Sequence, residues 1–149
     1  MRPPQPGSTR AQNYRRDRDA ATLGSTTACT VMDQQGKATA DFAFTDYSGK
    51  EFIFRLTHEQ RIAEARRILS GEETMSTHVM GKIRKTKVDY NPDWDFHLDP
   101  DAITFFTMAI EVCDASINYV NDYLDEACGA FLPGCFWCPW SSRLTRELR

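Results

Sequence analysis

Two cysteines near the C-terminus, Cys135 and Cys138, have the spacing of a redox dithiol or of half a zinc site. A redox pair normally opens a helix, because the helix N-terminus lowers the pKa of the first thiol. Here Pro133 precedes the pair and Pro139 follows it, with no helical pattern beyond. A zinc site needs two further ligands, which the other cysteines or His97 could supply only by chance proximity. We therefore expect a structural disulfide or free thiols, and a small thiol-redox or metal-binding protein is the alternative.

A second candidate is the stretch from Asp89 to Asp101, which reads DYNPDWDFHLDPD. Its alternating aspartates resemble the first half of a calcium-binding EF-hand loop. That loop needs glycine at its sixth position and glutamate at its twelfth, where this chain has Trp94 and Pro100. We therefore expect no metal site here, and predict that the aspartates cap turns in a rigid connection between strands.

His97 is the titratable residue of this stretch that lies between two apolar neighbours, Phe96 and Leu98. In a strand, the two neighbours would face the core and His97 would face outward. A hydrogen-bonded structural histidine is the favoured interpretation, and a role in ligand binding or acid–base chemistry is the alternative.

The sequence carries no pattern that is typical of catalysis. Ser116, Ser141 and Ser142 lie in no nucleophile elbow, and no glycine-rich phosphate loop is present. We therefore predict that the protein is not an enzyme and uses no cofactor.

Charge is distributed unevenly along the 149 residues, whose formal net charge is −3. Residues 1–40 carry a net charge of +3 and the remainder carries −6. The acidic body argues against nucleic-acid binding, which needs a basic face. The basic cluster of this body favours a solvated strand face or a lysine-protected edge, with a site for an acidic partner as the alternative. Its members are Lys82, Arg84, Lys85 and Lys87.

The apolar segments of the sequence are short. None approaches the roughly 18 residues of a membrane span. No apolar segment of the kind found in signal peptides follows the N-terminal charges. The expected location is therefore cytoplasmic by default.

The first regular structure is predicted after a long polar stretch. Residues 1–39 are rich in Pro, Arg, Gln, Ser, Thr and Gly, which predicts a disordered tail followed by a single domain over residues 40–149. Alternating apolar residues on both sides of a turn at 46–49 predict a β-hairpin. Thr57 and Gln60 then fit a helix capping box, and Gly71 fits the end of that helix.

The second half of the domain is predicted to add further strands and one helix. Residues 78–87 alternate as a strand, and the apolar run 103–113 favours a second, buried strand over a helix. Asp114 would then cap an amphipathic helix over residues 115–128. The fold class is therefore α+β, a mostly antiparallel sheet of four to five strands covered by two helices in the order β-β-α-β-β-β-α. A looped tail over 131–144, pinned by aromatics, would lead to a short polar end.

All three tryptophans fall in the two irregular, proline-containing segments. Rigid aromatics on such segments either close the end of a sheet core or form a recognition surface. The residues concerned are Trp94, Trp137 and Trp140, with Tyr90 and Pro139 beside them.

Three motifs resemble those of a known family. They lie at residues 90–100 (YNPDWDFHLDP), 109–115 (AIEVCDA) and 131–144 (FLPGCFWCPWSSRL). The chain resembles, over about residues 41–144, the N-terminal domain family of a secreted calmodulin-binding protein of about seventy-four kilodaltons, a BP-seventy-four-like domain. The resemblance implies a secreted location, and calmodulin binding or extracellular regulation, and supplies no catalytic residues. Cys135 stands where the family is expected to have another residue, which leaves room for a Cys135–Cys138 or a Cys128–Cys135 bridge.

The functional prediction is a non-enzymatic binding or regulatory domain with a protein partner that the sequence does not identify. Calmodulin is a weaker candidate, because the predicted helix over 59–70 carries both arginines and glutamates and so departs from the basic amphipathic helix that calmodulin targets use. The expected binding surface combines the 89–101 stretch with the 137–143 tail. Its residues are Tyr90, Asn91, Trp94, His97, Asp99, Trp137, Trp140 and Arg143.

Overall fold

The computed structural model describes residues 31–32 and 38–148. Most of the predicted disordered tail therefore lies outside the described residues. The part that is described forms strand: β1 (Val31–Met32) pairs antiparallel with the first two residues of β2 (Ala38–Thr45). The first long strand thus begins at Ala38, within the range predicted to be tail.

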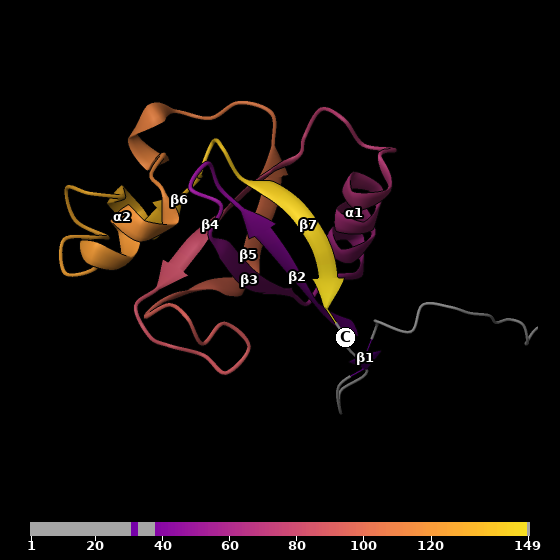
Figure 1. Cartoon of the computed structure of the whole chain (residues 1–149), viewed down its shortest axis with the longest axis horizontal. Coiled ribbons are helices and arrows are strands. Elements are labelled where there is room, and N and C mark those ends of the chain that lie inside the picture. Colours follow the sequence, from indigo (N-terminus) through magenta and orange to yellow (C-terminus); the bar gives the residue numbers. More distant parts are fainter. Residues whose placement is uncertain (1–30, 33–37, 149) are drawn as a thin grey trace, which may run out of the picture. The chain divides into compact units, whose positions relative to one another are not determined.

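The first sheet is built around β2. Strand β3 (Glu51–Leu56) pairs with one edge of β2 and strand β7 (Arg143–Leu148) pairs with the other, both antiparallel (Figure 1). The predicted hairpin is confirmed. Its turn is closed by the Gly49 N–H bonding to the Asp46 carbonyl at 2.9 Å, and Gly49 has a φ of 80°, which favours glycine.

A second, separate sheet of three strands is built around β4 (His78–Arg84). It pairs antiparallel with β5 (His97–Phe106) on one side and with β6 (Phe136–Trp137) on the other. Gly81 lies where the strands crowd, since a Cβ atom there would be only 3.0 Å from the Ala102 carbonyl oxygen. The expectation of one sheet was therefore wrong, although the α+β class and the antiparallel pairing are confirmed.

The difference arises from the two C-terminal strands. The polar end of the chain forms β7, because Leu144 packs into the core while Arg143, Thr145 and Arg146 stay exposed. The run 103–113 is divided as well: β5 begins earlier, at His97, and ends at Phe106. The remaining residues form a loop that ends in the short 3-10 helix η3 (Glu111–Cys113).

The two helices lie at opposite ends of the sheets in Figure 1. Helix α1 (Glu59–Ser70) ends at Gly71 as predicted, but His58 is its N-cap and the Thr57 hydroxyl bonds instead to Asp101 at 2.6 Å. Helix α2 (Ile117–Asp122) is shorter than predicted. Its N-cap is Ser116 and not Asp114, because the Ser116 hydroxyl accepts the Tyr119 N–H at 3.2 Å.

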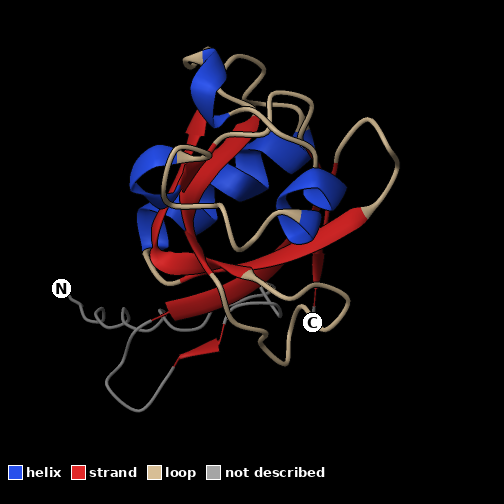
Figure 2. Cartoon of the chain, turned by 90° about the vertical axis from the view of Figure 1, so that its left-hand side faces the viewer, coloured by secondary structure: helices blue, strands red, loops and turns tan. Residues whose placement is uncertain are grey.

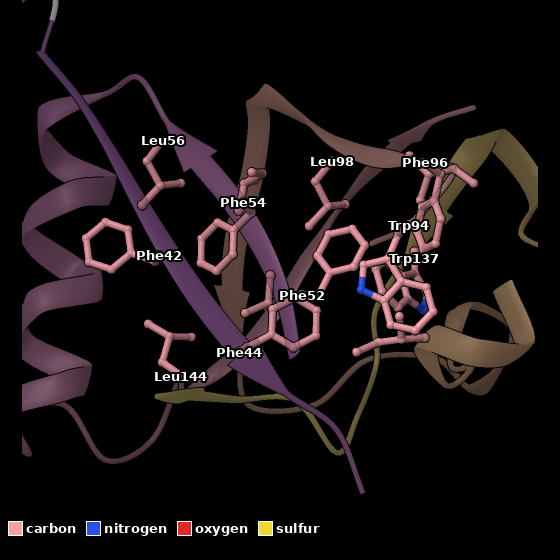
Figure 3. Packing of buried hydrophobic residues seen from close by; sticks show 14 of the residues in the cluster. Phe42, Phe44, Phe52, Phe54, Leu56, Trp94, Phe96, Leu98, Trp137 and Leu144 are labelled. Atoms are coloured by element: carbon pink, nitrogen blue, oxygen red, sulfur yellow. The ribbon is translucent and has the colours of Figure 1, made fainter. Parts of the chain in front are cut away.

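The core fills the space between the two sheets (Figure 3). Phe42 and Leu56 lie toward α1, whereas Trp94, Phe96 and Trp137 lie at the opposite end. The Trp137 side chain is fully buried. Its ring centroid lies 5.2 to 5.9 Å from the rings of three phenylalanines: Phe44, Phe52 and Phe96. Aromatic contacts therefore join the two sheets.

The free edge of β3 is closed by the loop between β4 and β5. Asn91 Oδ1 accepts the Ile53 N–H at 2.9 Å, and Trp94 Nε1 donates to the Glu51 carbonyl at 2.8 Å. The Asn91 amide also donates to the Phe96 carbonyl at 3.3 Å. The 89–101 stretch thus takes the place of a strand at this edge, where unpaired backbone groups would otherwise remain.

Two disulfides hold the C-terminal half. Cys113 bonds to Cys138 and Cys128 bonds to Cys135. The two cysteines of the CxxC spacing are therefore linked to different partners. One of the two bridges that Cys135 left open, Cys128–Cys135, is present, and the Cys135–Cys138 bridge is not.

Replacing Asn91 by alanine is expected to destabilise the fold. The buried Ile53 N–H and Phe96 carbonyl would lose their partners, and each unsatisfied buried group costs about 1–3 kcal/mol. We expect the free energy of unfolding, measured in urea, to fall by about 2–4 kcal/mol. Asp93→Ala, an exposed change in the same loop, serves as the matched control and is expected to leave the urea midpoint unchanged. Equal midpoints for both variants would contradict the edge-closing role of Asn91.

Removing the two disulfides is expected to destabilise the fold to different extents. Loop-closure entropy predicts a loss of roughly 3.5 kcal/mol for the Cys113–Cys138 pair, with a sequence separation of 25, and roughly 2.4 kcal/mol for the Cys128–Cys135 pair, with a separation of 7. Double Cys→Ser variants, compared by chemical unfolding, test this order. The reverse order would show that the longer loop is already constrained in the unfolded chain.

Candidate functional site

Three of the eight predicted binding residues belong to the interior of the domain. Asn91 and Trp94 are 2% and 8% exposed and bond to the edge of β3. Trp137 is fully buried, and its Nε1 donates to the Ala115 carbonyl at 2.9 Å. Their side chains are thus engaged within the fold and do not form an outer surface.

Three further predicted residues, Tyr90, His97 and Asp99, belong to the outer face of this loop and of β5. Beside Tyr90 is a surface depression, lined by Arg55, Val88, Asp89 and Tyr90 itself. The Arg55 guanidinium lies over the Tyr90 ring, 4.3 Å from its centroid, and forms two hydrogen bonds to Asp41 at 2.7 and 2.9 Å. Arg55 is therefore already neutralised, which makes it a poor anchor for an anionic ligand.

His97 and Asp99 are held by contacts within the domain. His97 points away from the core, between the buried Phe96 and Leu98, as predicted. Its Nδ1 lies 2.7 Å from the Thr86 carbonyl, which is the arrangement of a structural histidine. The Asp99 carboxylate pairs with Arg84 and also accepts the Asp101 N–H at 3.0 Å.

Two pKa values among these residues depart from their ordinary ranges. Burial raises the pKa of Tyr90, and the nearby Arg55 guanidinium offsets only part of the rise. Burial also opposes ionisation of Asp99. The Asp101 N–H and the Arg84 guanidinium outweigh it, so the pKa of Asp99 lies below its ordinary value. Both effects follow from internal contacts and point to no acid–base chemistry.

The basic cluster of β4 is likewise used inside the domain. Lys85 Nζ donates to the carbonyls of Leu124 and Ala127, at 3.1 and 2.9 Å, and so holds the end of the α2 segment. Lys87 Nζ donates to the Pro92 carbonyl at 3.0 Å and lies 3.2 Å from Asp95. With Arg84 also paired, the alternative of a site for an acidic partner gains no support.

Trp140 lies in a second, smaller core on the outer face of the second sheet. This core consists of Phe106, Cys113 and Cys138, and Trp140 packs against it together with Met80 and Ala109. Trp140 Nε1 is the buried side-chain polar atom that has no hydrogen-bond partner among residues 31–32 and 38–148. Arg143, the last of the predicted residues, is exposed at the start of β7.

The small core is covered by residues 107–114, which we call the strap. After β5 the strap runs to α2, and its helix η3 lies at the top of Figure 2, apart from α1 and α2. It is fastened to the tail by the Cys113–Cys138 disulfide and by the Cys138 N–H bonding to the Cys113 carbonyl at 2.8 Å. Asp114 Oδ1 also accepts the Trp140 N–H at 2.9 Å.

The outer side of the strap is apolar. Met108, Ile110 and Val112 are 79%, 70% and 50% exposed, and together they form what we call the apolar ridge. Ala109 and Cys113 face inward, against the small core. Sequence reasoning missed this ridge, because the run 103–113 was assigned as one buried strand. The polar Thr107 and Glu111, which interrupt the run, are the signal that could have revealed it.

The cysteines and the described side chains offer no separate chemistry. Cys113, Cys128, Cys135 and Cys138 are all in disulfides, so none is a free thiol. No group of three or more potential ligands that could hold a metal ion occurs in the described part of the chain. Within the same residues, no helix is both long enough and apolar enough to cross a membrane.

These features define a class: a disulfide-linked α+β domain of two antiparallel sheets with an exposed apolar ridge. A comparison with protein families places the chain further, since the family described as the BP-seventy-four N-terminal domain matches residues 38–149. The chain therefore belongs to this family, which confirms the resemblance stated above. No curated protein and no solved structure matches the chain.

The raised pKa of Tyr90 predicts a loss of stability at alkaline pH. The folded state holds the phenol proton more tightly than the unfolded chain does, so this stability is complete below the unfolded pKa of about 10 and is lost as pH rises through the folded pKa. In urea unfolding across this range, Tyr90→Phe is expected to show a shallower decline than the unaltered chain. Identical declines would show that Tyr90 does not titrate differently on folding.

Proposed function

We propose that this domain is a non-enzymatic binding domain that recognises another protein through the apolar ridge. The observation that carries the proposal is the exposure of Met108, Ile110 and Val112 side by side in sequence on a fastened strap. Apolar side chains that gather on the surface of a folded domain mark interaction sites more often than isolated ones do. The small core beneath the strap keeps the ridge in place before any partner arrives.

The same surface is suited to binding without a large structural change. Ala109 and Cys113 anchor the strap from below, and the disulfide and the Asp114–Trp140 hydrogen bond fix its far end. An interface that is already ordered loses little conformational entropy on association, which favours affinity. The ridge therefore needs no folding step when the partner binds.

The two disulfides also support a place of action outside the reducing cytosol. Disulfides persist in secreted and other oxidising environments and are rare where thiols are kept reduced. Cys113–Cys138 and Cys128–Cys135 account for all cysteines of the chain except Cys29. We therefore propose that the domain acts in an oxidising compartment, in contrast to the default expectation of a cytoplasmic location.

The other two functions weighed for the sequence receive less support. A thiol-redox role would need Cys135 and Cys138 to exchange with each other, and each is bonded elsewhere. A calmodulin-target role would need a free basic helix, whereas α1 buries Ile62 and Ala65. Its arginines also pair with acids: Arg61 with Glu64, and Arg66 with Glu147 at 2.7 Å.

The proposal predicts that binding is lost when the ridge becomes polar. The full chain is used as bait in chemical crosslinking with material from the cells that produce it, beside an Ile110→Ser variant. We expect the crosslinked products of the unaltered chain to be reduced about tenfold in the variant, since a buried isoleucine contributes roughly 1.5–3 kcal/mol. Ile110 is 70% exposed, so the variant is expected to unfold at the same temperature as the unaltered chain.

Met75→Ser is the matched control, because Met75 is also an exposed apolar residue, at 66%, but lies outside the ridge. It is expected to give the same crosslinked products as the unaltered chain. If Ile110→Ser and Met75→Ser behave alike, the ridge is not the binding surface.

A further inference from the structure

We propose that the apolar ridge and the adjoining surface of α2 bind a positively charged, amphipathic segment of the partner. This inference rests on the proposed function, because it takes the ridge as the binding surface. It adds the chemical class of the partner, which follows from the charges and rings around the ridge.

The first observation is the distribution of charge along the chain. Between Val88 and Ser142 there is no lysine or arginine, whereas aspartate and glutamate occur ten times. The ridge lies within this stretch, and Glu111 stands exposed between Ile110 and Val112. The surface formed by this part of the chain is therefore anionic unless basic residues from elsewhere compensate it.

The second observation is that the compensation is incomplete. Asp95 and Asp99 pair with Lys87 and Arg84 from the preceding strand and loop. The five later carboxylates form no ion pair within the described residues. They are Glu111, Asp114, Asp122, Asp125 and Glu126, and all five residues are exposed.

Two cations approach this surface from other elements. Lys85 is bound to the carbonyls at the end of the α2 segment, and Lys82 lies over the exposed ring of Phe136, 5.6 Å from its centroid. Two lysines do not balance five carboxylates. An excess of negative charge therefore remains on the strap and α2, and it attracts cationic partners.

The third observation is an exposed pair of tyrosines on α2 and at its C-cap. Tyr119 and Tyr123 are 49% and 40% exposed, and their ring centroids are 4.4 Å apart. Asp122 lies between them in the chain and Asp125 follows. An aromatic face beside carboxylates is suited to a lysine or arginine side chain, because the ring attracts the cation and the carboxylate pairs with it.

Apolar and anionic features therefore alternate along one stretch of chain, from Met108 to Glu126. The complement of this surface carries apolar side chains for the ridge and cations for the carboxylates and tyrosine rings. A basic amphipathic segment has both. An acidic partner such as calmodulin itself would meet like charge, which opposes association.

The test uses the full chain and two labelled peptides of equal length, one of leucine and lysine and the other of leucine and glutamate. Fluorescence anisotropy is expected to show binding of the lysine peptide only. Ile110→Ser is expected to weaken this binding about tenfold. Glu111→Lys is expected to weaken it as well, and added salt is expected to weaken it further, because screening reduces the attraction between exposed charges.

Two matched variants control for general effects. Glu72→Lys makes the same charge change at an exposed position outside the surface, and Met75→Ser makes the corresponding apolar change. Both are expected to keep the affinity of the unaltered chain. Equal weakening by Glu72→Lys and Glu111→Lys would mean that only net charge matters, and would overturn the assigned surface.

Three other outcomes would overturn the inference. The first is equal binding of both peptides, and the second is an affinity that ignores Ile110. The third is a dimer in sedimentation that Ile110→Ser abolishes while no peptide binds, because the ridge would then join two copies of this chain. If crosslinking still depends on Ile110 when the lysine peptide fails, only the partner class is wrong. If crosslinking ignores Ile110 too, the proposed function fails as well.

Discussion

The contact between Trp137 and the phenylalanines of the first sheet is the interaction on which the rest of the structure depends. Trp137 belongs to the shortest strand of the second sheet, yet its ring lies against Phe44 and Phe52 of the first. Without it the two sheets would share less apolar area at this end, and the strap would have no fixed base. The tail between β6 and β7 then carries the chain from one sheet to the other. Both the small core and the first sheet are therefore completed by the last residues of the domain.

The parts of the fold that the sequence predicted are those with local causes. The hairpin of β2 and β3 follows from strict alternation around a glycine turn, and the end of α1 follows from Gly71. The outward position of His97 follows from its two apolar neighbours. Each of these needs only a few residues and the geometry of a strand, a turn or a helix end.

The parts that the sequence did not predict have long-range causes. The end of the chain has little strand character by itself, and β7 forms because the edge of β2 offers it partners. Thr57 fits a helix cap by pattern, but Asp101, which is distant in sequence, offers its hydroxyl a closer acceptor. The division of the 103–113 run depends on a disulfide whose partner lies 25 residues away. None of these competitors is visible in a local window of sequence.

The candidate site shows the same limit from the opposite side. The aromatic motif residues suggested a surface because they lie in irregular segments, but Asn91 and Trp94 take the place of a strand partner along β3. The ridge, by contrast, is composed of residue types that normally indicate a core. Residue type alone could therefore not separate the two, since burial here is decided by which edge and which face each loop covers.

The Cys113–Cys138 bond has a consequence for how this surface can vary. It ties one end of the strap covalently, while Ala109 and Cys113 supply its contacts with the small core. The outward residues of the ridge therefore contribute little to holding the strap, and substitutions there leave the scaffold nearly unaffected. A binding face separated in this way from the stability of its scaffold can change its specificity through successive substitutions without passing through unfolded intermediates.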